Sequence, residues 1–149
     1  MSTYQQWIDL AEELGQKGKD LNVPVGCVIV NPDDTILSTG WNHIPFGIEN
    51  SDPRYKKPAK YFWVEHAERN AIYNAARDGV SLAGSTAYIN FSPQSICTNC
   101  VRALIQSGVI RFVGPNHGLN ARGKTVGGLS SKTVSRRMIE EANIEIIVV

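Results

Sequence analysis

The sequence lacks several features that would place it in an extreme class of protein. It has no long apolar run and no basic start followed by an apolar stretch, so neither a membrane span nor a secretory signal is predicted. We therefore expect a cytoplasmic protein. Lys and Arg number 15 against 14 Asp and Glu, and this near-neutral balance argues against a globally basic nucleic-acid binder. Repeats, low-complexity tracts and linkers are also missing, so residues 1–149 are predicted to form a single domain.

Acidic residues are missing from the whole stretch between Asp78 and Glu140. Residues 1–78 carry eight Lys or Arg and eleven Asp or Glu, a net charge of −3, whereas residues 79–149 carry seven and three, a net charge of +4. A positive half of this kind is a candidate anion-binding face, with scattered solvated charges as the alternative.

Cysteine is scarce, and its three copies are an odd number. Two of them form the motif Cys97-Thr-Asn-Cys100, a spacing that in a reducing compartment indicates metal or redox chemistry rather than a disulfide framework. The third, Cys27, lies in a short apolar run and is expected in the core.

Hydrophobic periodicity predicts alternating helices and strands, interrupted by two long loops. Helices are expected over residues 3–18 with an end near Gly15–Gly18, and over 66–77, 97–106 and about 130–142. Strands are expected over 23–30, 35–41, 86–91, 109–113 and 144–149, and loops over 42–60 and 114–128. The first two strands resemble a hairpin, and the β/α alternation after residue 66 predicts an α/β fold with a partly parallel sheet.

The residues that carry chemistry are His66 at the start of one predicted helix and the Cys97/Cys100 pair at the start of another. A helix N-terminus favours the thiolate form of cysteine, which is the form that binds metal. Two thiolates and one imidazole supply three ligands to a tetrahedral Zn²⁺, and an open fourth position is typical of catalytic sites. His43 and His117 lie in predicted loops, where we expect exposed or substrate-facing roles.

Glu68 follows His66 by two residues, where its carboxylate can reach a water on the metal without binding the metal itself. Such a group can take the proton of the water, protonate a ring nitrogen of the substrate and assist the leaving group. The alternative is an ordinary acid in the first turn of a helix, favoured by the helix dipole.

The motif His66-Ala-Glu68 followed by Cys97-x-x-Cys100 resembles that of zinc nucleobase deaminases. The chain is similar to the cytidine deaminase-like superfamily, and most similar to deoxycytidylate (dCMP) deaminases. The stretches that carry the resemblance are Pro24–Val30, Gly40-Trp-Asn42 with Pro45, His66–Ile72, Tyr88, Cys97-x-x-Cys100 and Ile105–Val109. The resemblance implies a three-layer α/β/α sandwich with a mixed, roughly five-stranded sheet. It also implies zinc-dependent conversion of dCMP to dUMP and ammonia, with zinc-bound hydroxide attacking C4 and Glu68 as proton shuttle.

The same resemblance suggests where a nucleotide would bind. Asn42 matches a position that contacts the sugar, although from the residues alone an asparagine at the end of a strand is more often a turn residue. The backbone around Ala67 would face the pyrimidine carbonyl. Phosphate requires cationic or N–H donors. Two clusters are candidates: Arg54 and Lys56 with Lys57 and Lys60, and Arg122 with Lys124.

One departure from the family leaves the identity of the base open. The family places a proline directly before the first cysteine, whereas Pro93 stands four residues before Cys97, which predicts a longer turn beside the pocket. The alternatives are deamination of another small aminated base or nucleotide (modified dCMP, guanine or adenine type), a tRNA or polynucleotide deaminase, and a non-catalytic zinc module. The resemblance further implies a homo-oligomer, for which a hexamer is one form, and allows dCTP and dTTP as effectors.

Overall fold

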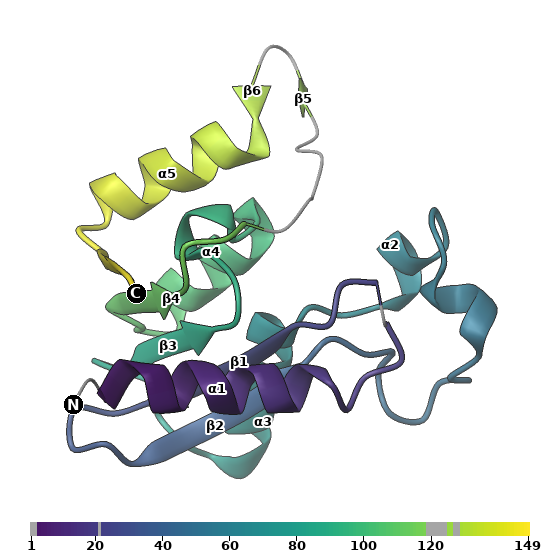
Figure 1. Ribbon diagram of the computed structural model, residues 1–149, viewed down its shortest axis with the longest axis horizontal. Helices are drawn as coiled ribbons and strands as arrows, with labels where there is room; N and C mark the ends of the chain where they lie inside the picture. The colour runs from purple at the N-terminus through teal and green to yellow at the C-terminus, as the bar shows by residue number, and fades with distance from the viewer. Residues whose placement is uncertain (1–2, 21, 119–124, 127–128) are drawn as a thin grey trace.

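A mixed five-stranded sheet in the order β2-β1-β3-β4-β7 forms the centre of the protein (Figure 1). This computed structural model describes residues 3–20, 22–118, 125–126 and 129–149. The strands are β1 (Gly26–Val30), β2 (Ile36–Trp41), β3 (Thr86–Ile89), β4 (Arg111–Gly114) and β7 (Glu145–Val148). β1 pairs antiparallel with β2 and β3, whereas β3 with β4 and β4 with β7 are parallel. The predicted mixed sheet is therefore confirmed.

Helices cover both faces of this sheet. They are α1 (Thr3–Gly15), α2 (Lys60–Trp63), α3 (Ala67–Asp78), α4 (Thr98–Gln106) and α5 (Ser131–Glu141), with short 3-10 turns η1 (Asp52–Tyr55) and η2 (Pro93–Ser95) and a small ribbon of β5 (Thr125–Val126) and β6 (Leu129–Ser130). The core cluster on one face includes residues of α3, α4 and α5, and the cluster on the other face includes residues of α1. This arrangement confirms the expected three-layer α/β/α sandwich.

Helix α1 packs on its face of the sheet through a stripe of apolar residues at helical spacing. Ile8, Ala11 and Leu14 are buried against β1 and β3. The contact is close because β1 begins at Gly26, where an added Cβ would lie 1.8 Å from the carbonyl oxygen of Ala11. Only a residue without a side chain allows this approach.

Helix α3 packs on the other face through three buried alanines, Ala67, Ala71 and Ala75. A Cβ on Gly40 of β2 would lie 2.5 Å from the oxygen of Ala67 and 2.5 Å from the nitrogen of Ala71, so the helix backbone rests directly on this glycine. The helix ends at Gly79, which has φ of 69° and takes the left-handed conformation that glycine adopts easily. Close contact with β2 therefore fixes the position of the first turn of α3.

Most predicted elements occur with shifted ends, and the two predicted loops contain short elements. The first helix ends at Gly15, within the range predicted for its end, whereas the first strand begins at Gly26 rather than residue 23, and the loop predicted over 42–60 contains η1 and borders α2. Pro53 at the start of η1 favours this turn, but a turn this short leaves no periodic apolar pattern to detect. In Figure 1 the α2 segment lies at the opposite end of the molecule from the N-terminus. Among the described helices, none combines the length and apolar composition that a bilayer crossing requires.

The Gly40 contact makes a testable prediction. Gly40→Ala should destabilise the protein by about 1–3 kcal/mol, because the added methyl group must push the first turn of α3 away from β2. Urea denaturation measures the change, with Thr39→Ala as a control because Thr39 is paired with Val28, whose side chain lies in the α1 cluster on the opposite face. An unchanged free energy of unfolding in Gly40→Ala would contradict the close packing.

Candidate metal and catalytic site

Two helix N-termini meet where the predicted metal ligands lie. His66 is the N-cap residue of α3 and Cys97 is the N-cap residue of α4, and both have extended backbone conformations. Neither side chain caps its own helix, so the imidazole and the thiol are directed to other partners. Cys100 follows within the first turn of α4 and is fully buried. The folding of the two helices therefore brings together residues that are 31 and 34 positions apart in the sequence.

The three predicted ligands form one compact cluster. Nδ1 of His66 lies 3.4 Å from Sγ of Cys97 and 3.4 Å from Sγ of Cys100, and the three donor atoms lie within 4.8 Å of one another. Tetrahedral zinc with ordinary Zn–S and Zn–N bond lengths separates a sulfur and a nitrogen ligand by about 3.6 Å. The donor set and its spacing both fit a zinc ion, and the cluster presents Nδ1 rather than Nε2.

The thiols of the cluster are strongly coupled. The hydrogen bond from Cys100, together with the His66 contact, lowers the pKa of Cys97 to about 4. The hydrogen bond to Cys97 and burial both raise the pKa of Cys100. Without metal, Cys100 thus holds the proton that the pair retains. Metal binding must displace that proton, because zinc binds thiolates.

Glu68 lies beside the cluster without belonging to it. Its Oε2 is 3.6 Å from Sγ of Cys100, and its side chain is almost completely buried. Burial raises the pKa of Glu68, while the charge of His66 acts in the opposite direction. A carboxyl group with a raised pKa can take and return a proton nearer neutral pH than an exposed glutamate can.

The turn before Cys97 differs from the family pattern and is nevertheless well packed. Ile96, which directly precedes Cys97, has φ of −62° and ψ of 130°, the backbone conformation that proline also adopts, and its side chain is buried. Pro93 begins η2, and η2 contacts α5, β4 and β7. The backbone N–H of Ser92 donates to the carbonyl of His117 at 2.7 Å. The extra length of the turn is thus taken up against α5 and the sheet.

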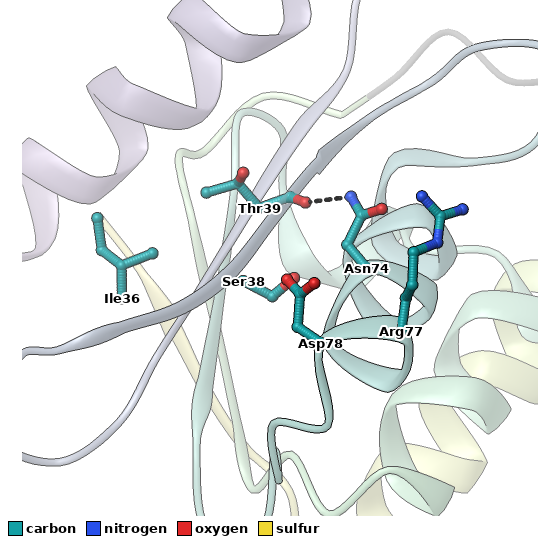
Figure 2. A pocket seen from close by; sticks show the side chains of 6 residues that line it. All are labelled: Ile36, Ser38, Thr39, Asn74, Arg77 and Asp78. Carbon is teal, nitrogen blue, oxygen red and sulfur yellow. Dashed lines mark hydrogen bonds between the residues drawn. The ribbon is translucent and has the colours of Figure 1, made fainter. Parts of the chain in front are cut away.

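Asparagines on α3 attach this helix to the edge strand β2. Nδ2 of Asn70 donates to the carbonyl of Trp41 at 2.8 Å, and Nδ2 of Asn74 donates to the carbonyl of Thr39 at 2.9 Å (Figure 2). The two carbonyls are two residues apart on the strand, and the two asparagines are four residues apart on the helix. Each asparagine therefore lies on the face of α3 that is directed to β2 and opposite a carbonyl on the same side of the strand. These bonds hold the His66 end of α3 against β2 and cover part of the strand edge.

A groove of about 360 Å³ lies farther along the same contact, lined by residues of β2 and α3 (Figure 2). Its α3 residues include Asn74, Arg77 and Asp78, at the end of the helix opposite His66. A helix rises 1.5 Å per residue, so the groove is roughly 15 Å from the metal ligands along α3. It is therefore not part of the metal site.

The predicted contacts to base and sugar fall near the cluster. Ala67 is the first residue of α3, directly after His66, and is completely buried, and its contact with a pyrimidine carbonyl stays a prediction. Asn42 is also buried, but its amide binds the protein backbone: Oδ1 accepts from Val25 N–H and Nδ2 donates to the Val23 carbonyl, both at 2.9 Å. Asn42 thus shapes the entry into β1, and its contact with a sugar stays a prediction.

The four-residue basic cluster is partly neutralised. Arg54 donates to the Glu49 carbonyl and pairs with the Glu49 carboxylate, and its guanidinium lies 3.7 Å from the centre of the Trp63 ring. Lys60 pairs with buried Asp20 at 3.1 Å. Within the described part of the chain, Lys56 and Lys57 are exposed and have no ion pair. The other predicted phosphate residues, Arg122 and Lys124, lie outside the described residues.

Sequence reasoning missed two residues that flank His66, Glu65 just before α3 and Arg69 in its first turn. Oε1 of Glu65 accepts from the backbone N–H of His66 at 3.0 Å and from Nε of Arg69 at 2.6 Å. The four-residue spacing of Glu65 and Arg69, on either side of His66, was the available signal. Exposed pairs with this spacing are common, which is why the spacing alone did not indicate a role.

Comparisons with known proteins find deaminases. A family model for the cytidine and deoxycytidylate deaminase zinc-binding region matches residues 1–114. A probable deoxycytidylate deaminase of Caenorhabditis elegans is 35% identical over 113 residues, covering 73% of this chain and 55% of the relative. An uncharacterized deaminase in the luxG 3' region of Aliivibrio fischeri is 30% identical over 145 residues, covering 95% and 90%.

Solved structures share the fold. The dCMP deaminase of cyanophage S-TIM5, in complex with dCMP and dUMP, has a TM-score of 0.75 at 23% identity, covering 100% of this chain and 99% of that one. At this identity the similarity establishes the fold alone. The chain spans about half the length of the animal deoxycytidylate deaminases that it matches.

The assigned ligands can be tested by metal analysis. The unmodified protein should contain about one zinc per chain, and His66→Ala, Cys97→Ser and Cys100→Ser should each lose most of it, because two remaining ligands hold zinc poorly. Cys27→Ala is the matched control, since the Cys27 thiol is buried in the core and is not one of the clustered donors. Full zinc content in any of the three ligand variants would refute the assignment of that residue.

Proposed function

Because the chain belongs to the zinc-binding family of cytidine and deoxycytidylate deaminases, we propose that it deaminates a deoxycytidine nucleotide, converting dCMP and water to dUMP and ammonia. The observation that carries this proposal is the buried Glu68 beside the His66, Cys97 and Cys100 donors. A purely structural zinc site has no use for such a carboxylate. The names of the matched relatives support the choice of dCMP.

The chain's own residues divide the chemistry between them. His66, Cys97 and Cys100 hold the metal, which when bound supplies an activated water at neutral pH. Glu68 takes one proton from the attacking water and gives it to the ring nitrogen next to C4. It then takes a second proton from the oxygen added at C4 and gives it to the departing amine, so that ammonia leaves and an oxo group remains. Burial of Glu68 and Ala67 keeps bulk water away from this exchange.

Phosphate and sugar contacts complete the proposal. Lys56, exposed and without an ion pair among the described residues, is a better phosphate candidate than Arg54, whose guanidinium is bound to Glu49 and Trp63. Arg122 and Lys124 stay as the second candidate pair. Asn42 keeps a free lone pair on Oδ1 for a sugar hydroxyl while holding its backbone bonds.

We also propose that residues 1–149 form a single domain. We further propose a cytoplasmic location, because two thiols that bind metal must remain reduced. A homo-oligomer is supported by large exposed apolar side chains, among them Phe46 and Phe62, which are 67% and 88% exposed. The hexameric form and the effectors dCTP and dTTP remain predictions from the resemblance.

Glu68→Gln tests the proton shuttle. The amide keeps the size of the side chain but cannot carry the proton, so the variant should retain its zinc and lose at least about a hundredfold in deamination rate. Ammonia release and zinc content are measured on the same sample, with Glu141→Gln, an exposed residue at the end of α5, as control. Full deaminase activity in Glu68→Gln would refute the mechanism.

A substrate panel tests the proposed function itself. Ammonia release is followed with dCMP, CMP, deoxycytidine, 5-methyl-dCMP, guanine, adenosine and a tRNA transcript. The proposal predicts the highest kcat/KM for dCMP, with a loss for deoxycytidine because the phosphate contact is missing. Preference for a free base, an unphosphorylated nucleoside or tRNA would overturn the proposal.

A further inference from the structure

We propose that Glu65 is a positioning residue for the metal site, and that its carboxylate holds His66 and Arg69 in the arrangement that retains zinc. The inference rests on the zinc role of His66 in the proposed function. It concerns a residue outside the ligand set, one position before the imidazole ligand.

The contacts of the Glu65 carboxylate carry the inference. A single oxygen, Oε1, accepts from the backbone N–H of His66 at 3.0 Å and from Nε of Arg69 at 2.6 Å. His66 is the N-cap of α3 and Arg69 lies one turn later, so the carboxylate joins the residue before the helix to its first turn. The backbone that carries the imidazole thus has a fixed partner on its N–H.

Glu65 is itself held from the other side. Its backbone N–H donates to the His43 carbonyl at 2.9 Å, and its own carbonyl accepts from the His43 N–H at 3.2 Å, forming an isolated antiparallel bridge. The carbonyl also lies 3.4 Å from Nδ2 of Asn70. The carboxylate therefore extends from an anchored backbone, and its position is determined by the end of β2 as well as by α3.

Arg69 connects this arrangement with the thiolates. Burial lowers the pKa of Arg69, but its electrostatic interactions with Cys100, Glu65 and Cys97 and its hydrogen bond to Glu65 outweigh burial and raise the pKa overall. The guanidinium held by Glu65 therefore favours the thiolate forms of the two cysteines, which are the forms that bind zinc. Its side chain is 18% exposed and that of Glu65 is 24% exposed, so the pair is better shielded than an ordinary surface ion pair.

Residues that orient metal ligands in this way typically change metal affinity by 10–100-fold when substituted. Glu65→Gln keeps the size of the side chain and a carbonyl oxygen, but loses the charge that holds Arg69. We expect zinc to pass from this variant to a coloured chelator about tenfold faster than from the unmodified protein. The readout is the first-order rate of zinc transfer, measured without any substrate.

The matched control is Glu145→Gln, which removes a 2.7 Å ion pair with Arg111 on the sheet. Its zinc transfer rate should equal that of the unmodified protein, and the thermal midpoint of metal-free Glu65→Gln should fall no further than that of metal-free Glu145→Gln. A zinc transfer rate in Glu65→Gln within twofold of the control would overturn the proposal. The proposal would also be overturned if Glu65→Gln released zinc faster but its metal-free thermal midpoint fell further than that of Glu145→Gln, because a general loss of stability would then explain the rate.

A second variant covers the case in which Glu65→Gln does not fold. Arg69→Lys keeps the positive charge but lacks the Nε donor, and it should also release zinc faster than the control, by a smaller factor. An unchanged rate in Arg69→Lys would then overturn the proposal. Because zinc transfer is measured without nucleotide, a protein that shows the predicted rates and deaminates nothing would refute the proposed function and leave the role of Glu65 intact.

Discussion

The contact between the first turn of α3 and strand β2 is the constraint on which the site depends. Gly40 leaves the space in which the backbone of Ala67 and Ala71 rests, and Asn70 and Asn74 bind the strand's carbonyls. Ser38 adds a buried hydrogen bond from its hydroxyl to the Ala71 carbonyl at 2.6 Å. A helix held at this number of points cannot shift along the strand, so His66 and Glu68 have fixed positions relative to α4.

The second requirement is electrostatic, because the site gathers negative groups in a buried place. Two thiol groups and the Glu68 carboxylate lie together, and burial alone would protonate all three. Hydrogen bonding within the Cys97/Cys100 pair, the contact with His66 and the nearby Arg69 oppose that tendency. The result is a site in which one thiolate is already formed before metal arrives, while Glu68 remains able to carry a proton.

The sequence predicted the parts of the site that follow from local geometry. Cys97 and Cys100 lie within one turn at a helix start and His66 begins another helix, so their spacing indicated a shared metal, and the structure brings the three donors together. Alternation of helices and strands likewise predicted the mixed sheet. The ends of elements were less accurate, as in the first strand, which begins at Gly26 rather than residue 23, because element ends depend on tertiary contacts such as that of Gly26 with Ala11.

What the sequence could not supply are the roles that depend on contacts distant in the chain. An asparagine at position 42 suits both a sugar contact and a turn, and only the fold shows that the amide of Asn42 is bound to the backbone of Val23 and Val25. The charge of Arg54 and Lys60 is evident from the sequence, but their pairing with Glu49 and Asp20 is not. Glu65 was overlooked because its four-residue spacing from Arg69 is that of an ordinary surface pair, and only the fold shows that its backbone is anchored by a bridge to His43.

The central claim is that this zinc site adds water to a cytosine nucleotide and releases its amine. The most direct measurement incubates the zinc-loaded protein with dCMP in water enriched in heavy oxygen and analyses the product by mass spectrometry. We expect dUMP with one heavy oxygen atom on the base, formed together with an equal amount of ammonia. Recovery of unchanged dCMP from zinc-loaded protein, or dUMP without the heavy atom, would contradict it.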